Sequence, residues 1–116
     1  CARLLDDDGV DAAIVGCVPL TPALNTLAPG AAHREDLARD DGVVTRLASL
    51  WNRTRKPWVM VVDGGALYDP MAAALGSAGI PVFRTADRAL RAFSRWAMWR
   101  LAGPRPQAAP AVDGVR

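Results

Sequence analysis

The stretch from Lys56 to Phe93 constrains the fold more tightly than any other part of this chain. It contains two apolar runs, Trp58–Val62 and Ile80–Phe83, separated by a helical pattern that ends at Gly79. Thr85 follows the second run and can cap a further helix. Strands that alternate with helices at this spacing predict an α/β fold, in which a parallel sheet carries helices on both faces.

A further strand is predicted near the start of the chain. Val10–Val18 is a mostly apolar run suited to a strand buried on both faces, and Pro19 ends it. Thr21 has the pattern of a helix N-cap followed by proline, so we expect a short helix over Pro22–Leu27. Cys1–Asp8 has the pattern of the last turns of a helix, so we expect a domain truncated at its N-terminus and cut from a longer polypeptide.

Three amphipathic helices are predicted from apolar residues that recur every three or four positions. Asp40 or Asp41 is expected to cap the first helix, and Gly79 is expected to end the second in a left-handed conformation. The three apolar stripes are Val43, Leu47, Leu50 and Trp51; Leu67, Met71, Leu75 and Ala78; and Ala86, Ala89, Leu90, Phe93, Ala97 and Leu101.

Length and composition limit the classes of protein to consider. With 116 residues the chain holds one domain, expected over residues 1–102, and the Pro- and Ala-rich residues 103–116 are expected to form a disordered tail or linker. A net charge of +2 does not indicate nucleic-acid binding, and no apolar run approaches the roughly 18 residues of a membrane span. The two cysteines do not form a disulfide framework, which favours a reducing cytoplasm.

The carboxyl edge of the predicted sheet is the expected ligand site. Three loops should meet there, over residues 16–21, 63–66 and 84–85, and each leads directly or nearly so into a helix start whose free N–H groups favour an anion. We expect Gly16, Thr21 and Asn25 to be the first candidates for phosphate binding, followed by Gly64 and Gly65. The alternative is that the two adjacent glycines only make a tight turn.

Other motifs give weaker indications of function. The dinucleotide fingerprint and the P-loop are absent, and the positions of the acidic residues and of Lys56 do not fit a phosphoacceptor receiver domain. His33 is expected to be a solvated loop histidine rather than a nucleophile or phosphoryl carrier, and Cys17 a small buried residue rather than a thiolate. The polar segment Ala28–Asp41 is either an insertion or a functional loop, and no group of residues suggests a catalytic or metal centre.

Trp99 is expected to lie outside the apolar stripe of the last helix, beside Arg88 and Arg95. A solvent-facing tryptophan between arginines is typical of an interface anchor. Alternatively, the end of the helix folds back and covers the edge of the sheet. Exposed apolar surface would also favour a homodimer.

Three stretches, LLDDDGVDAAIVGCVPL, RKPWVMVVDGG and LGSAGIPVFRTADRALRAFSRWA, cover most of the chain from Leu4 to Ala97. They resemble the ligase domain of nucleoside-diphosphate (ADP)-forming acyl-CoA synthetases and the C-terminal part of the succinyl-CoA synthetase β subunit. The resemblance implies a flavodoxin-like three-layer domain within a multidomain ligase. Such a ligase joins a small acid, for example acetate, to CoA while ATP becomes ADP and phosphate.

The resemblance also implies partners and cofactors. A CoA-binding domain and an ATP-grasp domain of the same enzyme would bind CoA, ATP or ADP and Mg²⁺, and a histidine on another domain would carry the phosphoryl group. Gly16–Leu27 would present a helix start to that phosphohistidine, whereas His33 does not match its motif. The fragment alone would bind no cofactor and catalyse nothing. The alternatives are a non-catalytic interaction module that kept the fold and an independent nucleotide-binding domain.

Overall fold

The computed structural model describes residues 1–19 and 22–103. Its strands are β1 (Ala13–Cys17), β2 (Trp58–Val62) and β3 (Val82–Phe83). Its helices are α1 (Ala2–Leu5), α2 (Val43–Arg53), α3 (Asp69–Ser77) and α4 (Ala86–Leu101), with 3₁₀ turns at Pro22–Leu24 and Ala66–Tyr68. The predicted tail falls outside the described residues, except for Gly103, and so does Thr21.

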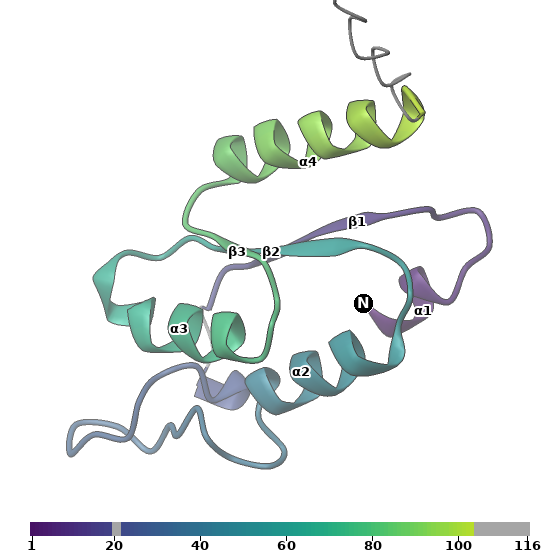
Figure 1. Ribbon diagram of the computed structural model, residues 1–116. Coiled ribbons are helices and arrows are strands. Elements are labelled where there is room, and N and C mark those ends of the chain that lie inside the picture. The colour runs from purple at the N-terminus through teal and green to yellow at the C-terminus, as the bar shows by residue number, and fades with distance from the viewer. Residues whose placement is uncertain (20–21, 104–116) are drawn as a thin grey trace, which may run out of the picture.

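The described strands form one parallel sheet in the order β1-β2-β3. Figure 1 shows α2 and α3 on one face of this sheet, with α1 on the same side, and α4 on the other face. The predicted parallel sheet with helices on both faces is therefore confirmed. Since β2 is the central strand, both helical layers are built on it.

Alternate residues of β2 face the two layers, as the two-residue period of a strand requires. Trp58, Met60 and Val62 lie in the larger core, which Leu47 and Leu50 of α2 and Met71 and Leu75 of α3 complete. Val59 and Val61 face α4, where Ala89 is buried and Phe93 is half-buried. All five residues of β2 are buried, which explains why the sequence predicts this strand with the correct bounds.

Several predicted details of the other elements are wrong. The N-cap of α2 is Gly42 without a side-chain hydrogen bond, so neither Asp40 nor Asp41 caps it; the Asp41 carboxylate binds Arg39 instead. Leu67 is exposed because it lies in the 3₁₀ turn before α3. Gly79 does end the second predicted helix region in a left-handed conformation, with φ 89°.

The sequence overestimates the burial of β1. Ala13 is buried, but Gly16 is exposed, and a Cβ placed on it would meet no atom within 4 Å. On this strand Val15 and Cys17 face the larger core, whereas Ile14 contacts the α4 layer. One face of β1 is therefore open to solvent near its carboxyl end.

The predicted apolar stripe of α4 is covered only in part. Ala89 is fully buried, but Leu90 is 55% and Leu101 86% exposed. A helix of 16 residues is about 24 Å long, whereas a strand of five residues spans about 17 Å. Because α4 starts at the carboxyl edge and is longer than the strands, its C-terminal end extends beyond the sheet (Figure 1).

The segment between β1 and α2 contains no described helix or strand apart from the Pro22–Leu24 turn, and polar contacts hold it in place. Glu35 accepts hydrogen bonds from the backbone N–H of Thr26 at 2.8 Å and from its hydroxyl at 3.0 Å. The N–H of Leu37 donates to the carbonyl of Leu27 at 2.8 Å. Segment 28–41 is therefore an ordered loop anchored at Thr26, which is buried.

Candidate functional site at the carboxyl edge

The carboxyl edge of the sheet gathers the ends of all three described strands. Because the strands are parallel, the segments after Cys17, Val62 and Phe83 emerge on the same side of the molecule. The structure thus brings Gly16 to the same edge as the Gly64-Gly65 turn. Whether Thr21 joins them lies outside the described residues.

Arg84, which directly follows β3, ties two of these loops together. Its guanidinium donates to the carbonyl of Tyr68 at 3.2 Å and to the carbonyl of Gly65 at 2.5 Å. It also forms an ion pair with Asp69 at 2.9 Å. Since Asp69 balances its charge and two carbonyls use its donors, Arg84 acts as a structural clamp rather than a free anion receptor.

Tyr68 connects the same region to the loop after β1. Its hydroxyl donates to the carbonyl of Pro19 at 2.9 Å. Its ring lies against Gly64, where an added Cβ would come within 2.5 Å of ring carbon Cδ2. Gly65 has a positive φ of 76°, a conformation that glycine adopts without strain. Both glycines are therefore explained by the turn and by the close approach of the Tyr68 ring.

Asn25 has φ 52°, a left-handed conformation that asparagine tolerates better than most residues. Its side-chain oxygen accepts a hydrogen bond from the N–H of Asp36 at 3.3 Å. This contact orients Asn25 toward the 28–41 loop. The prediction that Asn25 binds phosphate remains a prediction.

A hollow of about 320 Å³ remains open at the carboxyl edge, on the α4 side of the sheet. Gly16 forms part of its wall, and Ala86 places the start of α4 beside it. The exposed Asp63 also lines it, and its negative charge disfavours a free phosphate at this point. The lining residues are Ile14, Gly16, Cys17, Val18, Val61, Asp63 and Ala86.

Neither Cys17 nor His33 has the surroundings of a nucleophile. Burial raises the pKa of the Cys17 thiol, which therefore stays protonated at neutral pH. The Nδ1 atom of His33 accepts a hydrogen bond from the N–H of Glu35 at 3.2 Å, within the polar loop. Among the described residues, no group of three or more His, Cys, Asp or Glu side chains is placed to hold a metal ion.

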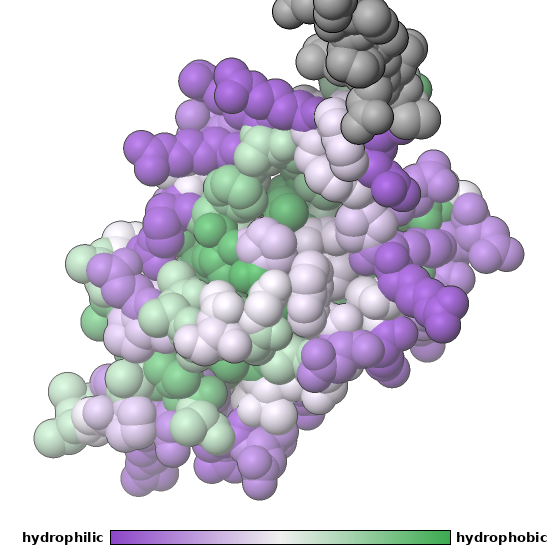
Figure 2. Space-filling view, viewed as in Figure 1, coloured by the Kyte–Doolittle hydropathy of each residue, from purple (hydrophilic) through white to green (hydrophobic). Residues whose placement is uncertain are grey.

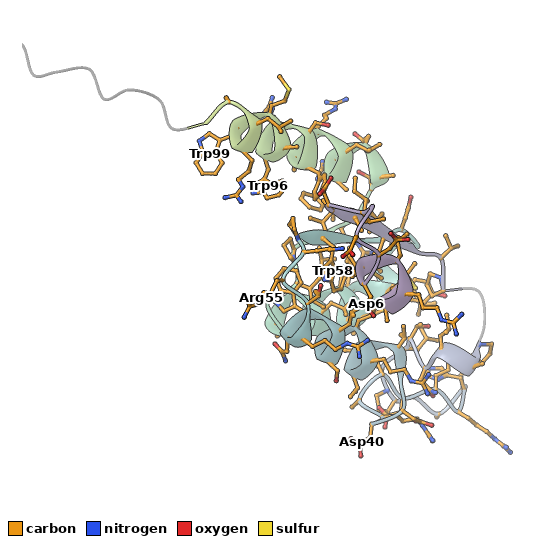
Figure 3. The ribbon with its side chains drawn as sticks, turned by 90° about the vertical axis from the view of Figure 1, so that its right-hand side faces the viewer. Asp6, Asp40, Arg55, Trp58, Trp96 and Trp99 are labelled. Atoms are coloured by element: carbon orange, nitrogen blue, oxygen red, sulfur yellow. The ribbon has the colours of Figure 1, made fainter. Side chains whose placement is uncertain are left out.

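The predicted interface residues lie on the exposed side of α4. Arg88 and Arg95 are exposed and Trp99 is 68% exposed. In Figure 3, Trp96 and Trp99 project from the end of α4 that stands away from the rest of the molecule. Trp99 therefore does not cover the edge of the sheet, and its role in an interface stays a prediction.

Sequence reasoning missed Tyr68 and Arg84, the two side chains that hold the carboxyl edge together. A possible signal was the tyrosine that follows the glycine pair, since a ring can lie over a residue without a Cβ. Another was an arginine directly after a strand, where loop carbonyls are within reach.

The chain therefore belongs to the class of α/β proteins with a parallel sheet between two helical layers. Comparison with protein-family models, with curated proteins and with solved structures finds no match to it. No helix in the described ranges, 1–19 and 22–103, is long and apolar enough to cross a membrane.

Proposed function

We propose that this chain is the flavodoxin-like domain of an ADP-forming acyl-CoA synthetase and is not catalytic by itself. The sequence resemblance suggests the family. The observation that carries the proposal is the open hollow beside Gly16, at the edge where parallel α/β proteins bind their ligands. In this proposal the hollow receives a loop from a neighbouring domain of the same enzyme.

The chemistry of the hollow favours a polypeptide loop over a free phosphate. Gly16 leaves its backbone uncovered, and Val18 is 64% exposed, so a loop can lie against main chain and apolar surface. The exposed Asp63 can accept hydrogen bonds from such a loop. The loop would carry the phosphohistidine, while Arg84 and Tyr68 keep the surrounding edge rigid.

CoA, ATP or ADP and Mg²⁺ would be bound by the CoA-binding and ATP-grasp domains of the parent enzyme. This assignment of the charged ligands to other domains fits the lining of the hollow, which contains no Lys or Arg among the described residues. The small acyl substrate would bind at the junction with those domains. A location in the cytoplasm, where CoA and ATP are abundant, is part of the same proposal.

The second candidate is an interaction module that kept the fold without the ligase chemistry. Asp63 in the hollow and the engagement of Arg84 by Asp69 favour it, because both reduce the attraction for a phosphorylated partner. An independent nucleotide-binding domain would require ATP or ADP binding by the 116-residue chain alone. We expect none in calorimetric titrations.

The proposal is tested by a Gly16→Trp variant in the enzyme assembled from this domain and the CoA-binding and ATP-grasp domains encoded with it. The indole would project from Gly16 into the hollow, because a Cβ on Gly16 meets no described atom within 4 Å. With acetate, CoA, ATP and Mg²⁺, we expect acyl-CoA formation to fall at least tenfold, about 1.4 kcal/mol in the barrier. Phosphorylation of the histidine from acyl-CoA and phosphate should fall in parallel.

Gly76→Trp is the matched control, because Gly76 is exposed, has no atom within 4 Å of an added Cβ, and lies on α3. It should leave the rate within about twofold of the unsubstituted enzyme, and both variants should keep its melting temperature. An assembled enzyme that forms no acyl-CoA and no phosphohistidine favours the interaction module. Full activity of Gly16→Trp overturns the role given to the hollow.

A further inference from the structure

A second hollow lies at the opposite, amino edge of the sheet, under the extended end of α4. Its volume is about 330 Å³. It exists because β3 pairs with Met60 and Val61, so no described strand lies next to Trp58 and Val59 on the β3 side. All of its lining residues are aromatic or aliphatic: Trp51, Pro57, Trp58, Val59, Pro81, Phe83, Ala92, Phe93 and Trp96.

Aromatic rings form most of the walls of this hollow, which suits a large apolar group. Trp51 and Trp58 pack edge to face with ring centroids 5.4 Å apart, and Phe93 and Trp96 pack at 5.4 Å on the α4 side. The indole N–H of Trp58, a residue 1% exposed, has no hydrogen-bond partner among the described residues. The hollow thus has aromatic walls, and one of its lining residues, Trp58, carries an N–H group without a described hydrogen-bond acceptor.

The rim is positively charged on both sides. Arg55 follows the end of α2, and Arg95 and Arg100 lie before and after Trp96 on α4. The guanidinium of Arg100 lies 5.9 Å from the centre of the Trp96 ring. Figure 3 shows Arg55 on the side of the molecule toward which Trp96 and Trp99 project, with Asp40 at the far end.

No ion pair among the described residues neutralises Arg55, Arg95 or Arg100. Residues 42–62 and 88–103, which supply all of the lining except Pro81 and Phe83, contain no Asp or Glu. The ion pairs found among the described residues involve other arginines, namely Arg39, Arg84 and Arg91. In Figure 2, hydrophilic side chains lie along the top of the molecule, above the hydrophobic ones that gather left of centre below α4.

We infer that the hollow docks an acidic polypeptide segment that inserts one large apolar side chain between Trp51 and Trp96. We choose an acidic partner because of charge complementarity. Carboxylates next to the inserted apolar side chain, the anchor, would lie close to Arg55 and Arg100. A second copy of this chain is disfavoured, since its own α4 would bring like charges together. Single-stranded nucleic acid, whose bases could stack on the same rings beside arginines, is the competing occupant that the test below distinguishes.

The inference is tested with the 116-residue chain and the capped peptide EDEFDED, at 50 mM and 300 mM NaCl. Binding is followed by ¹⁵N NMR at the four tryptophan indole N–H signals. We expect the signals of Trp51, Trp58 and Trp96 to shift, and affinity to fall at least fivefold at the higher salt concentration. The peptides EDEADED and KRKFKRK, which lack the anchor or the acidic charge, should bind at least tenfold more weakly.

Charge-reversal variants locate the contact. Arg55→Glu and Arg100→Glu should each weaken binding of EDEFDED at least fivefold, whereas Arg34→Glu, the same change in the exposed 28–41 loop, should not. Trp96→Ala should abolish the shifts while the dispersed signals of Trp51 and Trp58 report an intact fold.

Four results would overturn the inference. They are equal binding of EDEADED, an equal effect of Arg34→Glu, tighter binding of an oligo(U) strand with the same indole shifts, and indole shifts that depend on the concentration of the chain alone. The third would assign the hollow to nucleic acid, and the fourth to a second copy. None of these results bears on Gly16, so this inference and the proposed ligase role fail independently.

Discussion

The Glu35 carboxylate shows how single residues order a segment that lacks helices and strands. It accepts two hydrogen bonds from Thr26, which is 2% exposed, and so fixes the start of the 28–41 loop. The backbone N–H of Thr26 is the main reason why the pKa of Glu35 lies below its ordinary value. Sequence patterns identified the loop, but a bond between residues nine positions apart leaves no periodic signal.

Glu35→Gln should remove a pH-dependent part of the stability. Because the pKa of Glu35 is lower in the folded chain, the unfolded chain takes up the proton first. The stabilisation is therefore present above the unfolded pKa, near 4.5, and is lost as the pH falls through the lower folded value. Urea denaturation between pH 7 and pH 3 should show a loss of about 1 kcal/mol at pH 7 and a smaller difference from the unsubstituted chain as the pH falls below 4.5.

Asp8→Asn serves as the control for this experiment, since Asp8 is exposed and outside the loop. It should leave the pH profile of stability nearly unchanged. If Glu35→Gln followed the profile of the unsubstituted chain at every pH, the Thr26 contact would not order the loop.

At the scale of elements, the end of α3 depends on Gly79. Its φ of 89° lets the chain turn directly into β3, and Trp51 of α2 lies 3.2 Å from the position of an added Cβ. Gly79 thus joins α3, β3 and α2 at one point. Its conformation was predictable from the sequence because glycine typically follows a helix, whereas the contact with Trp51 was not.

Gly79→Ala should lower the free energy of unfolding by about 1–2 kcal/mol, because alanine in a left-handed conformation is strained. Chemical denaturation monitored by tryptophan fluorescence would measure it. Gly76→Ala, inside α3 with no close neighbour, is the matched control and should raise stability by up to about 1 kcal/mol. A similar effect of both substitutions would mean that conformational strain at Gly79 is unimportant.

The elements that sequence reasoning predicted best are those buried on both sides or marked by strong end signals. β2 has the predicted bounds because all five of its residues are apolar and buried. β1 and β3 are shorter than predicted, since apolar runs do not reveal where pairing with a neighbouring strand stops. The clamp of Arg84 and the hollow under α4 were not predicted, because both depend on distances between elements far apart in sequence.

At the scale of the whole molecule, the sheet has an outer edge along β1 with which no other described strand pairs. Residues 13–17 carry neither charge nor proline, the devices that usually protect such an edge. The exposed Gly16 faces the side of the sheet that α4 covers, and the exposed Leu90 belongs to α4 itself. This edge favours association between chains or with a neighbouring domain.

Gly16→Lys should reduce self-association by placing a charge on this edge. We expect light scattering of the 116-residue chain at millimolar concentration to show a smaller mean mass for Gly16→Lys than for the unsubstituted chain. Gly76→Lys, which adds the same charge on α3, should change the mean mass much less. Equal effects would indicate that net charge, rather than the β1 edge, governs association.

The central position of β2 has a consequence for how the molecule loses its structure. Its five buried residues point alternately into two cores. Detachment of either helical layer would therefore expose apolar side chains of β2 to water. A shift of β2 by one residue would turn Trp58 toward α4 and Val59 toward the larger core. Both cores would then be mispacked at once. The two layers therefore melt as a single cooperative unit, and no half-folded species with one intact layer should accumulate.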